Sequence, residues 1–313
     1  MTAPAVSICI PTYNYAHFLG DAIGSARLQS YRDVEIVVTD NCSTDGTPEL
    51  VARLMRQDPR IVYHRNEHNI GMVGNFNRCL ELARGRYVKF LCADDMLGPA
   101  CVARMVEVLD RHEDIALVTC GRVWVDDGGA RPLRYAGYAR RSVRVPGDQV
   151  MARCFFYGNL IGEPTAVMFR RAAAGRLFSD RYTQLMDLEM WFHLLRQGSL
   201  EFLREALCSI RQHAGQATQE NVEWGAVLED KRELFKEFHA KAAVRASLLK
   251  KASWDLRMAV TVRRTSAAGL AISPREIDEV FFSRVFRRLT YPLVSALWTA
   301  QRPRPPREQE NPD

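Results

Sequence analysis

The sequence predicts an α/β fold with a mostly parallel sheet, flanked by helices and followed by a helical C-terminal extension. Three observations support this prediction. Short runs of β-branched and aliphatic residues alternate with longer segments in which apolar residues recur at helical spacing. The strand-like runs are mostly apolar, which is typical of parallel strands buried on both faces. Polar clusters follow several of these runs, where the loops of such a sheet would lie.

Each element follows from a local pattern of residue types. Residues 6–10 form a β-branched run that Pro11 ends, and Pro48 suits the first turn of a helix. The expected strands are residues 6–10, 34–39, 61–63, 87–92, 115–119 and 165–169. The expected helices are residues 16–29, 47–56, 73–83, 99–111 and 185–195. Residues 126–148 lack such a pattern and are interpreted as an irregular, basic excursion.

Changes in composition mark the expected regions. Residues 1–220 carry the alternating pattern and should form one α/β domain, residues 221–301 are helix-rich, and the proline-rich residues 302–313 should be disordered. With 47% hydrophobic and 26% charged residues, the composition is ordinary for a soluble globular protein. No apolar run reaches the roughly 18–20 residues of a spanning helix, and no signal-peptide pattern is visible.

The eight cysteines are scattered and include no Cys-x-x-Cys pair. This pattern indicates neither a disulfide framework nor a zinc site, and several cysteines lie in apolar runs, where a free thiol behaves as a small hydrophobe. A reducing, cytoplasmic location is therefore predicted.

Positive charge is concentrated in the last quarter of the chain. Residues 241–313 contain 14 Lys and Arg against 7 Asp and Glu, whereas the whole chain has an excess of only six positive charges. Residues 281–301 space apolar side chains at helical intervals, with arginines between them. This segment either packs on the protein or a partner subunit, or lies on anionic lipid as an interfacial helix, the interpretation we favour. The protein is then peripheral on the inner face of the cytoplasmic membrane.

Polar clusters follow three of the predicted strands. Residues 11–14 (PTYN) form the first, Asp40 begins the second, and the pair Asp94–Asp95 forms the third. A helix cap would explain residues 44–47 of the second cluster but leaves Asp40 at the strand end unexplained. Adjacent carboxylates repel each other, so the Asp94–Asp95 pair, taken alone, fits a capped helix start and a cation site equally well. We expect both carboxylates to face solvent, short of protein partners.

Five stretches together resemble the inverting family 2 glycosyltransferases, which have a GT-A fold. In chain order they are VSICIPTYNYAHFL, VEIVVTDNCSTDGT, NIGMVGNFNRCLELARGRYVKFLCADDML, MDLEMWFHLLRQG and SIRQHAGQATQE. Each is modestly specific by itself, whereas five in the family's order are specific together. The resemblance covers about residues 5–220. It implies a GT-A-type, Rossmann-like sheet in a domain that binds a nucleotide sugar and catalyses transfer.

The resemblance also implies where the nucleotide and a cation bind. The nucleotide would contact Pro11, Thr12, Asn14, Asp40, Asn69, Gly71, Asn75 and Asp94. Within this set, Asp40 would accept a hydrogen bond from the base. Asp95, together with Asp94 and His213, would hold a divalent cation, Mn²⁺ or Mg²⁺.

The catalytic base implied by the resemblance is Asp187, at the start of the predicted helix over residues 185–195. The family often has Glu-Asp at this point, whereas this chain has Met186 before Asp187. Without that acidic neighbour, we expect Glu189 to take a supporting role.

The predicted reaction is a single displacement with inversion at the anomeric carbon. The cation would stabilise charge on the diphosphate leaving group, and the base would take the proton of the acceptor hydroxyl. The donor is interpreted as a UDP-sugar, and the acceptor as a saccharide, polyprenyl-diphosphate-linked or otherwise part of a surface polysaccharide. No nucleic-acid partner is expected. The alternatives are a non-catalytic, membrane-associated nucleotide-sugar binding protein and a sugar nucleotidyltransferase, whose glycine- and lysine-rich phosphate loop is missing.

Overall fold

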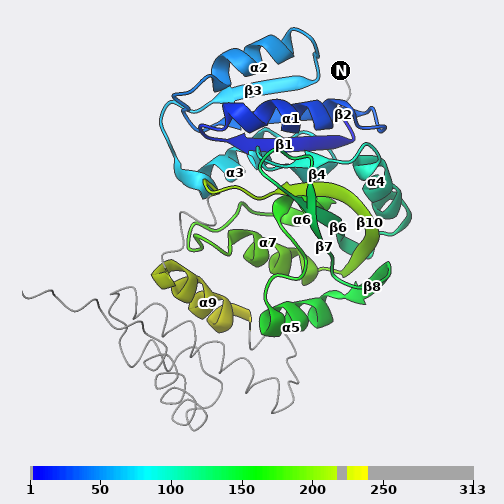
Figure 1. The fold of residues 1–313 in the computed structure, drawn as a ribbon. Coiled ribbons are helices and arrows are strands. Elements are labelled where there is room, and N and C mark those ends of the chain that lie inside the picture. The colour runs from blue at the N-terminus through cyan, green and yellow to red at the C-terminus, as the bar shows by residue number, and fades with distance from the viewer. Residues whose placement is uncertain (1–2, 217–223, 239–313) are drawn as a thin grey trace, which may run out of the picture. The chain divides into compact units, whose positions relative to one another are not determined.

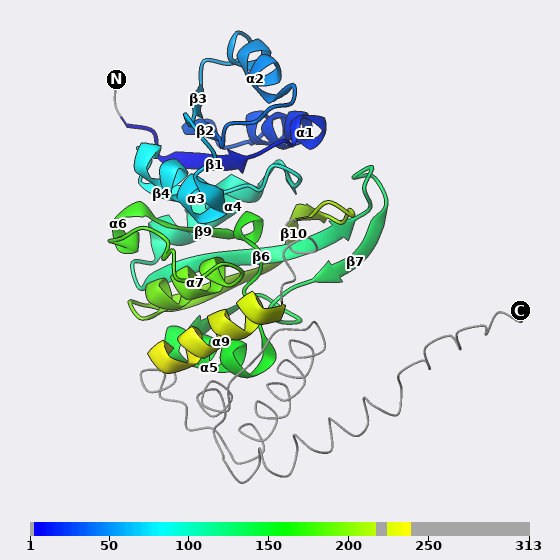
Figure 2. The same ribbon diagram turned by 90° about the vertical axis from the view of Figure 1, so that its left-hand side faces the viewer.

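A computed structural model describes residues 3–216 and 224–238 of the chain (Figure 1). Contacts between residues divide the chain into two compact units, Met1–Val222 and Glu223–Asp313. The predicted α/β fold is confirmed in the first unit, where helices lie on both sides of a ten-stranded sheet (Figures 1 and 2).

The elements of the first unit alternate as expected up to β4. The strands are β1 Val6–Thr12, β2 Val34–Asp40, β3 Ile61–Arg65, β4 Tyr87–Phe90, β5 Met96–Leu97, β6 Ile115–Val125, β7 Pro132–Ala136, β8 Val143–Pro146, β9 Val167–Arg170 and β10 Ser199–Arg211. The helices are α1 Ala16–Arg27, α2 Thr47–Met55, α3 Gly71–Leu82, α4 Cys101–Arg111, α5 Gly147–Tyr157, the 3₁₀ turn η1 Pro164–Ala166, α6 Arg171–Ala174 and α7 Met186–Leu195.

The sheet has a parallel half and a mixed half, in the order β3-β2-β1-β4-β9-β6-β10-β5. Strands β3, β2, β1 and β4 are parallel, β9 is antiparallel to both β4 and β6, and β6 is parallel to β10. The carboxyl ends of β1, β2 and β4 therefore meet at one edge, the usual place for ligands in such a sheet.

Two apolar layers cover the sheet. One layer joins the buried faces of α1 and α4 to side chains such as Ile8 and Ile10 of β1. The other layer contains a chain of aromatic rings, whose neighbouring centroids lie 5.0–6.4 Å apart. Its members are Phe76, Phe90, Phe169, Phe178 and Trp191. These layers hold the strand ends in fixed positions, since protein interiors are close-packed.

The prediction for residues 126–148 is wrong. Strand β7 pairs with β6 and β8 pairs with β10, as Figure 2 shows for β7 beside β6. Both are short, largely exposed strands, so they lack the apolar runs that mark the inner strands. Strand β10 was also not predicted. Register shifts between Leu203 and Cys208 interrupt it and place charged residues at its middle.

In the second unit the described residues form one helix, α9, over Trp224–Phe238. Leu234 and Phe238 on this helix are buried. The predicted interfacial segment, residues 281–301, and the predicted disordered tail, residues 302–313, lie outside the described residues. Among the helices that are described, none combines the length and apolar character that crossing a membrane requires.

Candidate active site

The ends of β1 and β2 form one side of the site. Thr12 and Asp40 are direct neighbours in the parallel register, and both are buried. One Asp40 oxygen accepts the Ser43 backbone N–H at 2.8 Å, and the other accepts the Tyr63 hydroxyl at 2.7 Å. Because Asp40 is fully enclosed, a hydrogen bond from a base to Asp40 requires one of these partners to move. The Thr12 hydroxyl oxygen is buried with no partner among the described residues.

Four asparagines form a hydrogen-bonded network at this edge. Asn41 donates to Asn69 Oδ1 at 2.7 Å, and Asn66 donates to the side-chain oxygens of Asn41 and Asn75 at 3.2 and 3.1 Å. Asn75 also donates to two backbone carbonyl oxygens near the ends of β1 and β2, at 3.2 and 3.0 Å. The predicted residues Asn69 and Asn75 therefore brace the strand ends. Asn41 and Asn66 were not singled out, because their partners are distant in sequence.

Left-handed backbone conformations shape the loops around this network. Asn14, which follows β1, has a φ of 55°, and its side chain accepts the Thr44 N–H at 2.8 Å. Gly71 has a φ of 77° at the start of α3, a conformation that favours glycine. Asp45 accepts the backbone N–H of Thr47, the first residue of α2, at 3.0 Å in a local turn, whereas the capping position itself is Gly46. Pro11 lies within β1, beside these loops.

The two carboxylates after β4 have different surroundings. Asp95 is 3% exposed, and its oxygens accept the Thr165 hydroxyl at 2.5 Å and the Arg211 backbone N–H at 3.0 Å. Asp94 Oδ2 lies 3.2 Å from His213 Nε2. The expectation that both carboxylates face solvent without partners is therefore wrong. The side chain of Asp95 points inward toward η1 and β10, and that of Asp94, 15% exposed, is paired with His213.

Arg211 ties this turn to the rest of the site, although the sequence analysis did not single it out. Its side chain is 2% exposed and donates to the Asp94 carbonyl oxygen and to the Asp21 carboxylate, each at 2.9 Å. The guanidinium carbon lies 4.6 Å from the centre of the Phe18 ring, within the range of a cation–π contact. Arg211 thus joins α1 to the turn after β4. The only hint in the sequence is its position two residues before His213.

The side chains at this turn suit a hard divalent cation. Cys92, Asp94 and Asp95 offer ligand atoms that lie within 4.8 Å of one another. Burial, and then the charge of Asp94, raise the pKa of Asp95 well above its usual value. A cation would oppose both effects, and carboxylate oxygens are the ligands that Mg²⁺ and Mn²⁺ prefer. The residues therefore fit the predicted cation, with Asp94 and Asp95 as the side chains that would hold it.

Asp187 lies in the first turn of α7 and is partly buried. Asn159 Nδ2 donates to its Oδ2 at 3.1 Å, and the Leu188 backbone N–H donates to its Oδ1 at 2.6 Å. Burial raises the pKa of Asp187 to about 7, with a further contribution from the charge of Glu163 and opposition from these two hydrogen bonds. A carboxylate that titrates near neutral pH is suited to act as a general base in a cell.

The structure does not bring Glu189 to Asp187. Glu189 is 1% exposed and forms an ion pair with Arg176. Two residues are about 200° apart around an α-helix, so positions 187 and 189 lie on nearly opposite faces of α7.

The loop over residues 159–165 (NLIGEPT) connects the two acidic centres and was not predicted as part of the site. At its start, Asn159 binds Asp187. At its end, the Thr165 hydroxyl donates to Asp95 and accepts the Cys92 backbone N–H at 3.0 Å. In the sequence, its Asn, Gly and Pro residues indicate only a turn.

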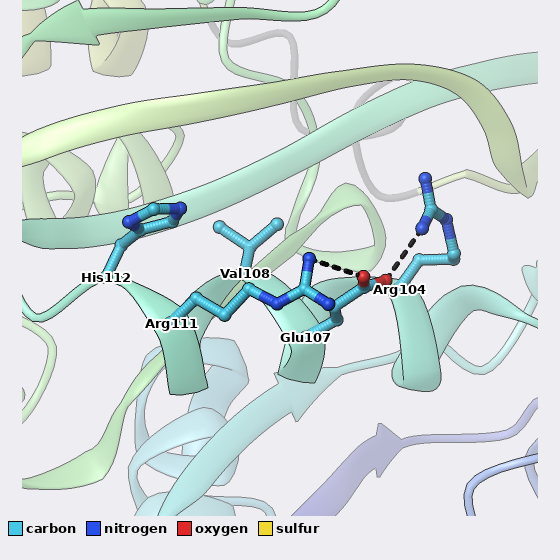
Figure 3. Close-up of a pocket in the computed structure, with 5 residues that line it drawn as sticks. All are labelled: Arg104, Glu107, Val108, Arg111 and His112. Atoms are coloured by element: carbon cyan, nitrogen blue, oxygen red, sulfur yellow. Dashed lines mark hydrogen bonds and ion pairs between the residues drawn. The ribbon is translucent and has the colours of Figure 1, made fainter.

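A separate pocket lies on α4 and contains none of the predicted site residues (Figure 3). It is lined by Arg104, Glu107, Val108, Arg111 and His112. Both arginines are paired with Glu107, at 2.7 and 2.8 Å. The pocket therefore belongs to the outer surface of one helix.

A GT-A-type sheet with acidic side chains at its strand ends defines a class of enzymes, the glycosyltransferases. The family model described as "Glycosyl transferase family 2" matches residues 7–178, more than half of the chain. The chain therefore belongs to glycosyltransferase family 2.

Relatives with known sequences agree with this assignment. An uncharacterized protein of Mycobacterium tuberculosis is 32% identical over 222 residues, which is 67% of each chain. EpsE of Bacillus subtilis, which carries a glycosyltransferase name, is 27% identical over 67% of this chain and 74% of its own. TuaG of Bacillus subtilis is 29% identical over 66% of this chain and 79% of its own, and its name assigns it to teichuronic acid biosynthesis.

Solved structures share the fold. TarS of Staphylococcus aureus in complex with UDP has a TM-score of 0.59 and 16% identity, over 96% of this chain and 93% of its own. TarS was also solved with UDP-GlcNAc, with the same TM-score and identity over 94% and 91% of the two chains. The mannosyltransferase PcManGT of Pyrobaculum calidifontis, in complex with GDP-Man and Mn²⁺, has a TM-score of 0.52 and 18% identity over 96% and 88%.

Proposed function

We propose that this enzyme is a metal-dependent, inverting glycosyltransferase that transfers a sugar from a UDP-sugar to a saccharide of a surface polysaccharide. The observation that carries the proposal is that one loop, residues 159–165, contacts both acidic centres. This loop binds Asp95 of the turn after β4 at one end and Asp187 of α7 at the other. The UDP-bound TarS structures support the choice of donor, and the name of TuaG supports the class of acceptor.

In this proposal Asp187 is the base. Its Oδ2, oriented by Asn159, takes the proton of the acceptor hydroxyl while the hydroxyl oxygen forms a bond to the anomeric carbon. The bond from that carbon to the diphosphate breaks in the same step, so the configuration inverts. Mn²⁺ or Mg²⁺ at Asp94 and Asp95 would supply positive charge to the departing diphosphate.

The nucleoside is proposed to lie at the ends of β1 and β2. The buried hydroxyl of Thr12 has no hydrogen-bond partner within the described ranges, and buried polar groups in native proteins are usually satisfied. Asp40, beside Thr12, retains lone pairs that accept a base N–H once Tyr63 or the Ser43 turn moves.

A thermal-shift panel tests the donor and the cation together. UDP, GDP, dTDP and CMP are each added with Mn²⁺ and with a chelator, and Mn²⁺ alone is the control. We expect UDP with Mn²⁺ to raise the unfolding midpoint by a few degrees, because a ligand that binds only the folded state stabilises it by about 2.7 kcal/mol at 100 times its Kd. An equal shift with the chelator would contradict the cation. No shift with any nucleotide would contradict the function.

The acceptor is proposed to be lipid-linked, with the basic C-terminal region in contact with anionic lipid. The support is the excess of positive charge in residues 241–313. Deletion of residues 280–313 is expected to reduce sedimentation with phosphatidylglycerol vesicles at low salt by about tenfold, since each basic residue near such a surface contributes about 1 kcal/mol. Undiminished sedimentation of the truncated protein would refute this contact.

A further inference from the structure

Glu163 lies in the middle of the loop that joins the two acidic centres. The preceding residue, Gly162, is held by Asn159, which accepts the Gly162 N–H at 3.0 Å and donates to its carbonyl oxygen at 3.2 Å. The same Asn159 amide contacts Asp187. Two residues beyond Glu163, Thr165 donates to Asp95. The backbone of Glu163 is thus fixed between the proposed base and the proposed cation site.

Arg122 of β6 fixes the side chain of Glu163. Its Nε lies 2.5 Å from Glu163 Oε2 in an ion pair without hydrogen-bond geometry, and both atoms are enclosed. The Glu163 side chain is 34% exposed. Because Oε2 is enclosed, this exposed surface belongs to the other atoms of the side chain. Gly162, with a φ of 121°, passes so close to the guanidinium that a Cβ would lie 3.0 Å from it. Glycine at position 162 makes room for the ion pair.

The guanidinium of Arg122 is not fully satisfied within the described part of the chain. The residue is 6% exposed, and its Nη1 is buried without a hydrogen-bond partner among the described residues. A buried donor without a partner is unusual in a native structure and points to a ligand group that completes it. The Glu163 carboxylate accepts hydrogen bonds and the Arg122 guanidinium donates them, so a hydroxyl group satisfies both.

We propose that Glu163 and Arg122 bind hydroxyl groups of the sugar being transferred and so help to select the donor. The inference rests on the proposed function. In a single displacement the anomeric carbon lies between the leaving oxygen and the attacking hydroxyl. With the diphosphate at the Asp94–Asp95 turn and the hydroxyl at Asp187, the sugar lies beside Glu163. A carboxylate there favours a neutral sugar and repels a uronic acid.

The test compares the binding of a nucleotide with that of its sugar conjugate. In calorimetric titrations with Mn²⁺ at pH 8.5, Glu163→Gln is expected to bind UDP within about twofold of wild type. The same variant is expected to bind UDP-N-acetylglucosamine about tenfold or more weakly, because it loses a hydrogen bond to a charged group. At pH 8.5 Asp187 is ionised in both proteins. If the thermal-shift panel shows that GDP binds instead of UDP, then GDP and GDP-mannose replace UDP and UDP-N-acetylglucosamine in these titrations.

A second pair of variants separates recognition from folding. Glu163→Gln leaves Arg122 without a counter-charge, so Arg122→Met with Glu163→Gln removes the whole ion pair, a change that is often tolerated. Glu163→Asp keeps the charge but shortens the side chain. We expect both variants to lose affinity for the sugar conjugate selectively, with thermal midpoints near that of wild type.

Three outcomes would overturn the proposal. Equal losses of UDP and UDP-N-acetylglucosamine affinity would place Glu163 in support of the nucleotide site. Unchanged affinity for the conjugate, in a wild-type enzyme that transfers its sugar, would remove Glu163 from donor recognition while leaving the proposed function intact. A wild-type protein that binds no nucleotide sugar would refute the proposed function and this inference with it.

Discussion

Replacement of Asp187 by asparagine is expected to lower kcat by about 10²–10⁴-fold, the usual contribution of a general base. Donor affinity is expected to stay within about twofold, because among the described residues Asp187 is hydrogen-bonded to Asn159 and the Leu188 N–H and not to the strand ends where the nucleotide is proposed to bind. Single-turnover transfer and calorimetric donor binding measure the two quantities separately. Asp148→Asn, the same change at an exposed position on α5, is the matched control and should leave both unaltered.

The pH dependence of kcat/KM tests the same residue independently. The base acts only when ionised, and burial raises the pKa of Asp187 to about 7. We therefore expect kcat/KM to fall about tenfold per pH unit below pH 7 and to level off above it, since this quantity reports groups of the free enzyme.

Substitutions of two neighbours of Asp187 should shift the acidic limb of the kcat/KM profile, the fall below pH 7, in opposite directions. Asn159→Ala removes a hydrogen bond that lowers the pKa of Asp187, so the limb moves to higher pH. Glu163→Gln removes a charge that raises this pKa, so the limb moves to lower pH. A limb that stays in place in both variants belongs to another group, and the role of Asp187 as base is then wrong.

The Asp95→Asn substitution is expected to reduce activity strongly while leaving the free energy of unfolding nearly unchanged. Activity should fall by about 10²–10³-fold and nucleotide binding should lose its dependence on Mn²⁺, because a cation at such a site contributes several kcal/mol. The free energy of unfolding without metal should change by less than about 1 kcal/mol. Burial and Asp94 already favour the neutral form of Asp95, and a neutral amide resembles it and still accepts the Arg211 N–H.

Urea unfolding with a chelator and thermal shifts with UDP, with and without Mn²⁺, measure these effects. Asp148→Asn again serves as the control. A loss of several kcal/mol in the metal-free Asp95→Asn protein would assign Asp95 a structural role. An unaltered response to Mn²⁺ would remove it from the cation site.

Sequence reasoning reached the parts of the fold that local patterns determine. Strands β1, β2 and β4 are mostly apolar runs, so the strand ends that carry Asp40 and the Asp94–Asp95 pair were identified correctly. The exposed strands β7 and β8 and the irregular strand β10 were not, because their packing depends on neighbours far along the chain.

The same distinction applies to the site. Asp95 faces inward because its partners, Thr165 and Arg211, lie 70 and 116 residues away in the sequence. No residue pattern in or near the stretch FLCADDML indicates these distant partners. The surroundings of Asp187 likewise depend on Asn159, which lies 28 residues before it.

The loop over residues 159–165 has a consequence for how such enzymes diversify. Its two ends, Asn159 and Thr165, are committed to the acidic centres, so changes there disturb the chemistry itself. The side chain of Glu163, by contrast, forms an ion pair with Arg122 of β6. If these two residues select the sugar as proposed, substitution of positions 122 and 163 together is a short evolutionary route to a new sugar preference, and a library that varies both codons is the place to start engineering one.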